Sequence, residues 1–239
     1  MHAETPPRLD ADETRAHWDE QAVGYDEAKA RNDVYYGTLK ALVSAWVPAD
    51  RRGRVLDVGC GTGQILAALE PAAGLGIDAS GGMIERAQAA FAGRPELDFR
   101  VGDAAALEDL PGHGGFDAAI SADLLEHVAS WERVVDAIAF AVRPGGRIVL
   151  TTPSPRWAAA LWVLEKARLK MPEGPHVFVP LAAIRRRLEA AGGRILHAQT
   201  HLAVPARLGG LGPAISRGLE GLPVGRGLGV IQLVVADRA

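Results

Sequence analysis

Three aspartates and a run of alternating glycines are the residues of this chain best suited to bind a ligand. Residues 55–63 read VLDVGCGTG, so Asp57 precedes glycines at positions 59, 61 and 63. Asp78 closes the segment GLGID, and Asp103 closes VGD. A glycine-rich turn leaving a strand lets the backbone approach a ligand closely, and carboxylates accept hydrogen bonds from hydroxyl and amine groups. The pattern predicts a nucleoside-containing ligand at the carboxyl ends of successive strands.

The spacing of the glycines distinguishes between the kinds of nucleoside-containing ligand that such a turn can bind. A loop for ATP or GTP phosphates would end in Gly-Lys-Ser or Gly-Lys-Thr, whereas Gln64 and Ile65 follow the last glycine. A dinucleotide loop has its third glycine one residue later, and Asp57 would bring negative charge near a pyrophosphate. An acid at that point favours a ligand with a cationic end, such as S-adenosylmethionine. The carboxylate of Asp78 could accept from both ribose hydroxyls, although dinucleotide sites use the same contact. Asp103 could accept from the adenine amine.

Two histidines are candidates for proton transfer. His127 follows an apolar segment in LLEHV, and His176 lies in GPHVFVP. An imidazole near its ordinary pKa can accept a hydroxyl proton at neutral pH. We expect His127 to be the base, with His176 as the alternative. Glu126 could orient His127, or it could serve the acceptor or a metal.

Composition excludes several classes of protein. The chain has 239 residues, of which 48% are hydrophobic, and 26 basic residues stand against 29 acidic ones, for a net charge of −3. This balance argues against a nucleic-acid partner. Cys60 is the single cysteine, so no internal disulfide and no thiolate cluster can form, and we predict no metal site. With neither a secretory signal nor an apolar run of about 20 residues, the sequence predicts a cytoplasmic protein.

The order of elements predicts how these residues are positioned. Residues 1–13 read as a mobile tail, and 14–239 as a single domain. Helical patterns cover 14–30, with Thr14 as a possible N-cap, and 35–47, where Leu39, Leu42, Val43 and Trp46 share a face. Short strands then alternate with helices, which is typical of a mostly parallel sheet with βαβ units. The strands are expected at 55–59, 74–78, 97–103, 116–123, 146–153, 194–204 and 228–237.

Residues 154–179 fall outside this alternation and form a cap insertion. Their segment WAAALWVLEKARLKM is apolar on nearly every face in its first turns and then basic. Such a helix can pack on the body, cover a pocket, contact a second copy or lie on lipid. We predict that it covers a pocket for an apolar or aromatic acceptor and also touches a membrane if that acceptor is lipidic.

The successive motifs resemble those of class I S-adenosylmethionine-dependent methyltransferases. The resemblance rests on VLDVGCGTG, GIDAS with MIERA, VGDA, and FDAAIS followed by LLEHV and RPGGRIVLTTP. It is strongest to the group that contains the ubiquinone-biosynthesis O-methyltransferases, and it covers about residues 14–200. It implies an α/β, Rossmann-like fold whose seven-stranded, mostly parallel sheet has the order 3-2-1-4-5-7-6, with helices on both faces and the last strand antiparallel.

The resemblance also implies roles for particular residues. The methionine part of the cofactor would lie on Asp57 and on the loop of Gly59, Cys60, Gly61 and Gly63. The ribose would lie on Asp78, beside Ala79. The remaining expected cofactor contacts are Met83 at the adenine, Asp103 and Ala104 at its amino edge, Ala122 near the sulfonium, and Tyr25 closing over the cofactor. No base is placed to activate Cys60 as a nucleophile.

The function implied is transfer of a methyl group from S-adenosylmethionine to a small molecule. A hydroxyl on an apolar or aromatic metabolite is the expected acceptor, and N- or C-methylation is the alternative. A non-catalytic subunit that binds S-adenosylmethionine, or a nucleotide-dependent oxidoreductase, would share some of these residues. Monomer and homodimer both remain open.

Overall fold

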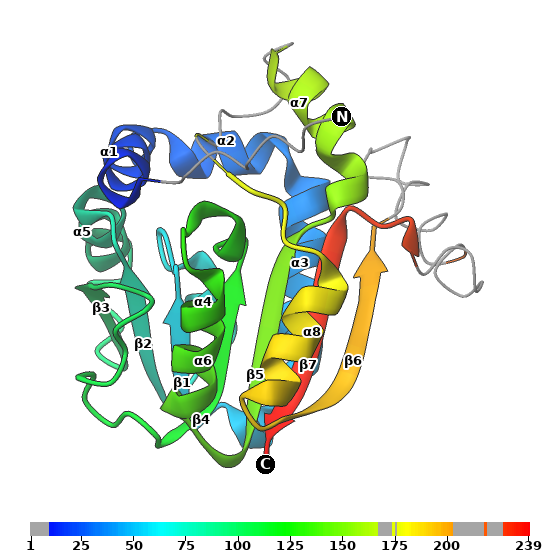
Figure 1. The fold of residues 1–239 in the computed structure, drawn as a ribbon. Coiled ribbons are helices and arrows are strands. Elements are labelled where there is room, and N and C mark those ends of the chain that lie inside the picture. Colours follow the sequence, from blue (N-terminus) through cyan, green and yellow to red (C-terminus); the bar gives the residue numbers. More distant parts are fainter. Residues whose placement is uncertain (1–9, 167–173, 175, 203–217, 219–226) are drawn as a thin grey trace.

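The computed structural model describes residues 10–166, 174, 176–202, 218 and 227–239. Its centre is a seven-stranded sheet with the order β3-β2-β1-β4-β5-β7-β6, which confirms the expected order (Figure 1). The strands are β1 (Arg54–Val58), β2 (Ala73–Asp78), β3 (Leu97–Val101), β4 (Phe116–Ala122), β5 (Val142–Pro153), β6 (Gly193–His201) and β7 (Ile231–Arg238).

Strand directions place the sequence motifs at one edge of the sheet. β1 to β5 pair in parallel, whereas β7 runs antiparallel to both β5 and β6. Asp57 on β1 is level with Gly76 on β2 and with Ile120 on β4. Because the carboxyl ends of parallel strands meet at the same edge, the residues that follow β1, β2 and β4 lie next to one another.

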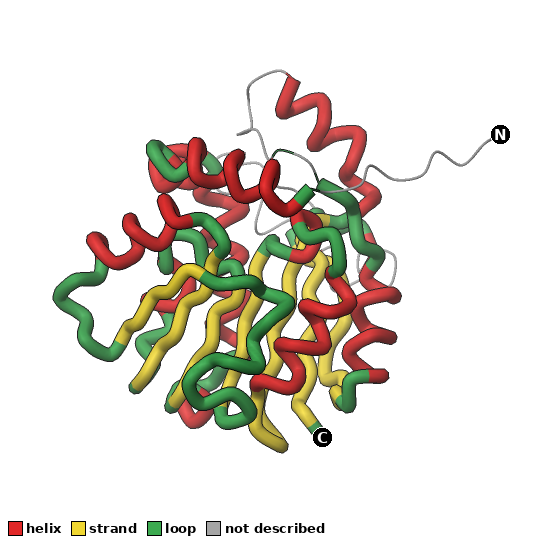
Figure 2. Tube along the Cα trace, turned by 60° about the vertical axis from the view of Figure 1, so that its left-hand side comes forward, coloured by secondary structure: helices red, strands yellow, loops and turns green. Residues whose placement is uncertain are grey.

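Helices cover both faces of the sheet (Figure 2). On one face, α3 (Asp33–Trp46), α4 (Gln64–Ala68) and α5 (Gly81–Ala90) pack through residues such as Val43, Leu66 and Ile84. On the other, α6 (Trp131–Ala141) and α8 (Leu181–Ala190) pack through Ile138 and Leu188. Each fully buried aliphatic side chain contributes roughly 1.5–3 kcal/mol. These two apolar layers hold the carboxyl edge of the sheet in place.

The N-terminal segment differs from the expectation. α1 (Ala11–Gln21) begins three residues before Thr14, because the Asp10 carboxylate caps it by accepting from the backbone N–H groups of Asp12 and Glu13. The tail expected over 1–13 is therefore too long, and residues 1–9 lie outside the described part. The single helix expected over 14–30 is also wrong. Gly24 has φ +100 and separates α1 from α2 (Tyr25–Arg31), and both helices lie above the carboxyl edge (Figure 1).

The cap insertion begins with the 3-10 helix η3 (Pro155–Trp157) and α7 (Ala158–Lys166), which rises away from the sheet (Figure 1). None of the residues of α7 is buried, and Trp162 and Val163 are 61% and 55% exposed. Gln232 on β7 joins the two ends of the insertion, because its amide donates to the carbonyls of Pro153 and Val179. Residues 167–173 and 175, and most of the Gly/Pro-rich segment at 205–227, lie outside the described residues. No helix in the described part is long and apolar enough to cross a membrane.

Candidate functional site

A cavity of about 520 Å³ opens at the carboxyl ends of β1, β2 and β4, beneath α1 and α2. Its lining brings together residues that are far apart in the sequence. Eleven of the twelve cofactor residues expected from the sequence line it, namely Tyr25, Asp57, Gly59, Cys60, Gly61, Asp78, Ala79, Met83, Asp103, Ala104 and Ala122. The twelfth, Gly63, is not among the lining residues.

The glycines of the loop are required first by the backbone and by the protein's own side chains. Gly59, Gly61 and Gly63 have φ of +75, +53 and +77, values that other residues rarely adopt. A Cβ on Gly63 would lie 2.5 Å from the Phe99 ring, and one on Gly59 would lie 2.9 Å from Leu124. From the sequence, all three glycines were expected to allow the close approach of a ligand. The structure gives Gly63 a different role, because it leaves room for the Phe99 ring beneath the loop.

Asp57 is a buried carboxylate whose charge is only partly compensated. It is 1% exposed, and its Oδ2 has no hydrogen-bond partner within the described chain. Burial, and secondarily the negative charge of Asp78, raise its pKa from 3.8 to about 7. A cationic group in the cavity would supply the missing interaction. Asp57 is therefore positioned to bind the cationic end of a ligand such as S-adenosylmethionine, as the sequence predicted.

Asp78 stands at the end of β2 and organises the turn beside it. Its Oδ2 accepts from the N–H of Gly61 at 2.8 Å, and its Oδ1 accepts from the N–H of Ser80 at 2.9 Å. Burial raises the pKa of this carboxyl, against the effect of these two hydrogen bonds. The carboxylate is thereby fixed on the cavity wall, where it can accept from the hydroxyls of a ribose.

The other predicted residues of the cavity have simpler surroundings. Cys60 is buried, and burial raises the pKa of its thiol well above the ordinary value, so the thiol stays protonated and unreactive. Met83 is 2% exposed at the start of α5. Asp103 accepts from the N–H of Ala105 at 2.8 Å, which turns the chain after β3 along the cavity.

The roof of the cavity includes residues that the sequence analysis did not select. Trp18 from α1 and Lys29 from α2 line it together with Tyr25. The Trp18 and Tyr25 rings meet edge to face at 6.0 Å, and the Lys29 ammonium lies 4.2 Å from the centre of the Tyr25 ring. Both aromatic residues lie in the segment HWDEQAVGYD at 17–26, of which the sequence analysis selected only Tyr25.

A smaller cavity of about 40 Å³ adjoins the first and shares part of its lining. Both cavities are lined by Trp18, Tyr25, Lys29, Ile65, Ala122, Asp123 and His127. The smaller one adds Tyr35, Tyr36, Leu39, Glu126 and Pro153. It therefore combines aromatic rings with two carboxylates, and it starts where the first cavity ends.

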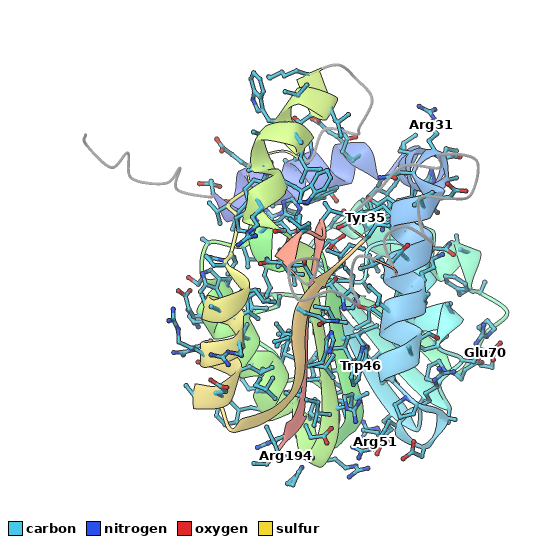
Figure 3. All side chains as sticks on the ribbon, turned by 90° about the vertical axis from the view of Figure 1, so that its right-hand side faces the viewer. Arg31, Tyr35, Trp46, Arg51, Glu70 and Arg194 are labelled. Atoms are coloured by element: carbon cyan, nitrogen blue, oxygen red, sulfur yellow. The ribbon has the colours of Figure 1, made fainter. Side chains whose placement is uncertain are left out.

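Asp123 occupies the boundary between the two cavities. Its φ of +55 is a conformation that non-glycine residues adopt rarely, and such residues concentrate at functional sites. Its Oδ2 accepts from the hydroxyl of Tyr35 at 2.9 Å. Burial raises the pKa of Tyr35 well above its ordinary value, and the negative charge of Asp123 adds to the effect. Figure 3 shows Tyr35 at the end of α3 nearest the carboxyl edge of the sheet.

The two candidate bases lie close together. The rings of His127 and His176 are 6.1 Å apart, although 49 positions separate them in the sequence. His127 is 7% exposed and lines both cavities, and its Nε2 is 3.9 Å from Oε1 of Glu126. His176 lines neither cavity, and its Nδ1 lies 3.0 Å from the carbonyl oxygen of Gly174. Geometry thus favours His127 over His176 for contact with an acceptor.

Two further expectations concern the cap and metals. None of the described residues of α7 lines either cavity, so the roof comes from α1 and α2 rather than from the described part of the cap. Within the described ranges, no group of three or more His, Cys, Asp or Glu side chains is arranged to hold a metal ion.

Comparison with known proteins identifies the family. A model of the methyltransferase domain matches residues 29–198, which is well over half of the chain. The chain belongs to the methyltransferase domain family. S-adenosylmethionine is accordingly the cofactor of this domain. The cavity, the Asp57 oxygen that lacks a hydrogen-bond partner within the described chain, and the Asp78 carboxylate agree with it.

Curated relatives carry a more specific name. The chain is 28% identical over 192 residues to the human mitochondrial ubiquinone biosynthesis O-methyltransferase, covering 73% of this chain and 52% of the relative. It is 37% identical over 135 residues to the ubiquinone biosynthesis O-methyltransferase of Chromobacterium violaceum, covering 52% of this chain and 56% of the relative. The matched region therefore spans only about half the length of these relatives.

Solved structures share the fold. A methyltransferase from Thermotoga maritima, described as a possible histamine N-methyltransferase, superposes with a TM-score of 0.70 over 95% of this chain and all of its own, at 17% identity. Magnesium protoporphyrin IX methyltransferase from Synechocystis, with bound S-adenosylhomocysteine, gives a TM-score of 0.65 at 22% identity, covering 96% of this chain and 100% of its own. At these identities the likeness shows the fold alone.

Proposed function

We propose that this domain transfers the methyl group of S-adenosylmethionine to a hydroxyl of a small, apolar or aromatic molecule. The observation that carries the proposal is the junction of the two cavities at Ala122, Asp123 and His127. The larger cavity has the size and the carboxylates for the cofactor. The smaller one, of about 40 Å³, adjoins it at these residues and has room for the reacting hydroxyl of an acceptor, which it would surround with aromatic rings and carboxylates.

Different residues around the larger cavity would bind different parts of the cofactor. Asp57 would hold the ammonium group of the methionine part, and Lys29, across the cavity roof, would hold its carboxylate. The positive charge of Lys29 already lowers the pKa values of Asp57 and Asp78 against the larger effect of burial. Asp78 would accept from the ribose hydroxyls. When bound, S-adenosylmethionine supplies an electrophilic methyl group on a sulfonium.

The chain's remaining contribution is to align the acceptor, exclude water and remove one proton. His127 is the residue placed for that proton, because its ring borders both cavities and is almost entirely buried. Trp18 and Tyr25 cover the junction from α1 and α2. Glu126, which accepts from the Thr152 hydroxyl at 2.8 Å, adds a second carboxylate to the acceptor side.

An apolar cluster next to the smaller cavity supports an apolar acceptor. It contains Leu39 and Ile231, with Tyr35, Trp157 and Leu161 packed against it, so it leads from the junction to the root of α7. The exposed Trp162 and Val163 on α7, followed by Lys166, form a surface suited to the interface of a membrane. We propose that α7 receives lipidic acceptors there. The curated relatives carry ubiquinone biosynthesis in their names, and ubiquinone precursors are lipidic.

A panel of acceptors tests the proposed reaction. The purified chain is incubated with S-adenosylmethionine and with phenols and catechols, each with and without a farnesyl side chain, beside anilines of the same shape. S-adenosylhomocysteine formation should be observed with hydroxylated rings, and the farnesylated compounds should have the lower KM. With the best acceptor, His127→Ala should lower kcat about 100-fold at unchanged affinity for S-adenosylhomocysteine.

His176→Ala provides the matched comparison, because His176 lies beside His127 but outside both cavities. It should lower kcat far less than His127→Ala does. Methylation of the anilines but not the phenols would contradict O-methylation. Binding of S-adenosylhomocysteine without turnover on any acceptor would instead indicate a non-catalytic subunit.

A further inference from the structure

Helix α1 lies over the site without an apolar anchor of its own. None of its residues, Ala11–Gln21, is buried. Most stability of short helices in proteins comes from packing an apolar face, so α1 depends on a few specific contacts to stay in place. Two neighbouring residues, Asp19 and Trp18, make such contacts, and Arg86 on α5 also donates to the carbonyl of Ala22 at the end of α1.

Asp19 attaches α1 to the N-terminus of α5. Its Oδ1 accepts from the hydroxyl of Ser80 at 2.6 Å and from the N–H of Gly82 at 3.0 Å. These hydrogen bonds, chiefly the one from Ser80, lower the pKa of Asp19. Ser80 also donates its backbone N–H to Asp78. Ser80 therefore connects Asp78, the carboxylate proposed to bind the ribose, with Asp19, the carboxylate that holds α1.

Trp18 projects from the same helix onto the candidate base. Its indole meets the ring of His127 edge to face at 5.0 Å, with an interplanar angle of 82°. His127 also faces His176, with the ring centres 6.1 Å apart, and the His176 ring in turn meets Phe178 at 5.2 Å. The imidazole is thus in contact with a ring from α1 and with a ring from the segment that follows the cap.

We propose that Trp18 is a positioning residue for His127, and that α1, attached through Asp19, orients this imidazole only when it is docked on α5. The proposal rests on the function proposed above for His127. Because Ser80 connects Asp19 to Asp78, binding of the ribose and docking of α1 reinforce each other.

The test uses the full chain saturated with S-adenosylhomocysteine and compares Trp18→Ala, Trp18→Phe and Glu20→Ala. Glu20 is exposed on the same helix and serves as the matched control. The side-chain resonances of His127, assigned with His127→Gln, are followed by NMR through a pH titration. Glu126 and His176 face this imidazole and Lys29 lines the same cavities; all three are kept in every variant. In Trp18→Ala the His127 resonances and their midpoint should move, whereas Trp18→Phe and Glu20→Ala should stay near the parent.

Turnover of the best phenolic acceptor gives the second readout. Trp18→Ala should lower kcat about tenfold at saturating S-adenosylmethionine, and Trp18→Phe should recover most of the rate. Asp19→Ala should reproduce the loss, while Asp19→Asn, which keeps an acceptor oxygen, should not. An unmoved His127 signal in Trp18→Ala would overturn the proposal. The NMR result is independent of the acceptor, so inactivity of the parent toward every acceptor would contradict only the proposed function.

Discussion

Replacement of Asp57 by Asn should stabilise the cofactor-free protein while weakening its cofactor binding. Asp57 is buried and its Oδ2 is unpaired within the described chain, so its charge opposes folding until a cation arrives. The asparagine side chain would have nearly the same shape without the charge. The variant therefore separates the cost of this carboxylate to the fold from its role in binding.

The pKa gives the size and the direction of the effect. The folded chain keeps a proton on Asp57 up to pH about 7, whereas the unfolded chain releases it near 3.8. Between these values the folded state binds more protons, so stability is lost as the pH rises. At 1.36 kcal/mol per unit, the loss between pH 5 and pH 8 is at most about 3 kcal/mol. Asp57→Asn should remove this loss.

Urea unfolding of the cofactor-free protein at pH 5 and pH 8 measures the stability, and calorimetry with S-adenosylhomocysteine at pH 8 measures the binding. The variant should already be somewhat more stable than the parent at pH 5, because that pH lies above the unfolded pKa of 3.8, and its advantage should grow by up to about 3 kcal/mol at pH 8. It should bind S-adenosylhomocysteine roughly 10- to 100-fold more weakly, since a charge-assisted contact is lost. Parallel pH dependences of stability for the two proteins, or undiminished binding, would refute the reasoning.

Three further changes have direct expectations. Asp78→Ala should weaken S-adenosylmethionine and S-adenosylhomocysteine alike, by about 2 kcal/mol in calorimetry, because both contain the ribose; unequal losses would contradict the assignment. Gly63→Ala should lower the free energy of unfolding by about 1–3 kcal/mol in urea, because φ is +77 and a Cβ would meet Phe99 at 2.5 Å; full stability would contradict that packing. Trp162→Ser should reduce sedimentation of the protein with anionic phospholipid vesicles and leave turnover of unfarnesylated phenols unchanged; undiminished sedimentation would remove α7 from the proposed membrane contact.

The central sheet and the cofactor loop could be predicted because their signals are local. VLDVGCGTG contains most of β1 and a turn with three positive-φ glycines, and α4 begins at the next residue, Gln64. The strands that follow are indicated by their apolar runs. The sheet order came from the resemblance of successive motifs, and the pairing confirms it. Helix ends were less predictable. Both Asp10 and Thr14 are good N-cap residues, and only the observed bonds from Asp12 and Glu13 to Asp10 decide between them.

The acceptor side of the site was less predictable because contacts between distant segments create it. Nothing near His127 in the sequence indicates that His176 lies beside it or that Trp18 packs on its ring. Asp123 was known only as the end of a strand, and its contact with Tyr35 joins residues 88 positions apart. Lys29 and Trp18 enter the cavity through the placement of α1 and α2, which amphipathic pattern alone does not specify.

A crystal structure with S-adenosylhomocysteine is the most direct test of the account. We expect the ribose hydroxyls on Asp78, the ammonium on Asp57, and the sulfur beside Ala122, facing the smaller cavity and the ring of His127. That arrangement would place the transferred methyl group at the junction of the two cavities. A sulfur directed away from the smaller cavity, with His127 separated from it by the adenosine, would contradict the proposed site of methyl transfer.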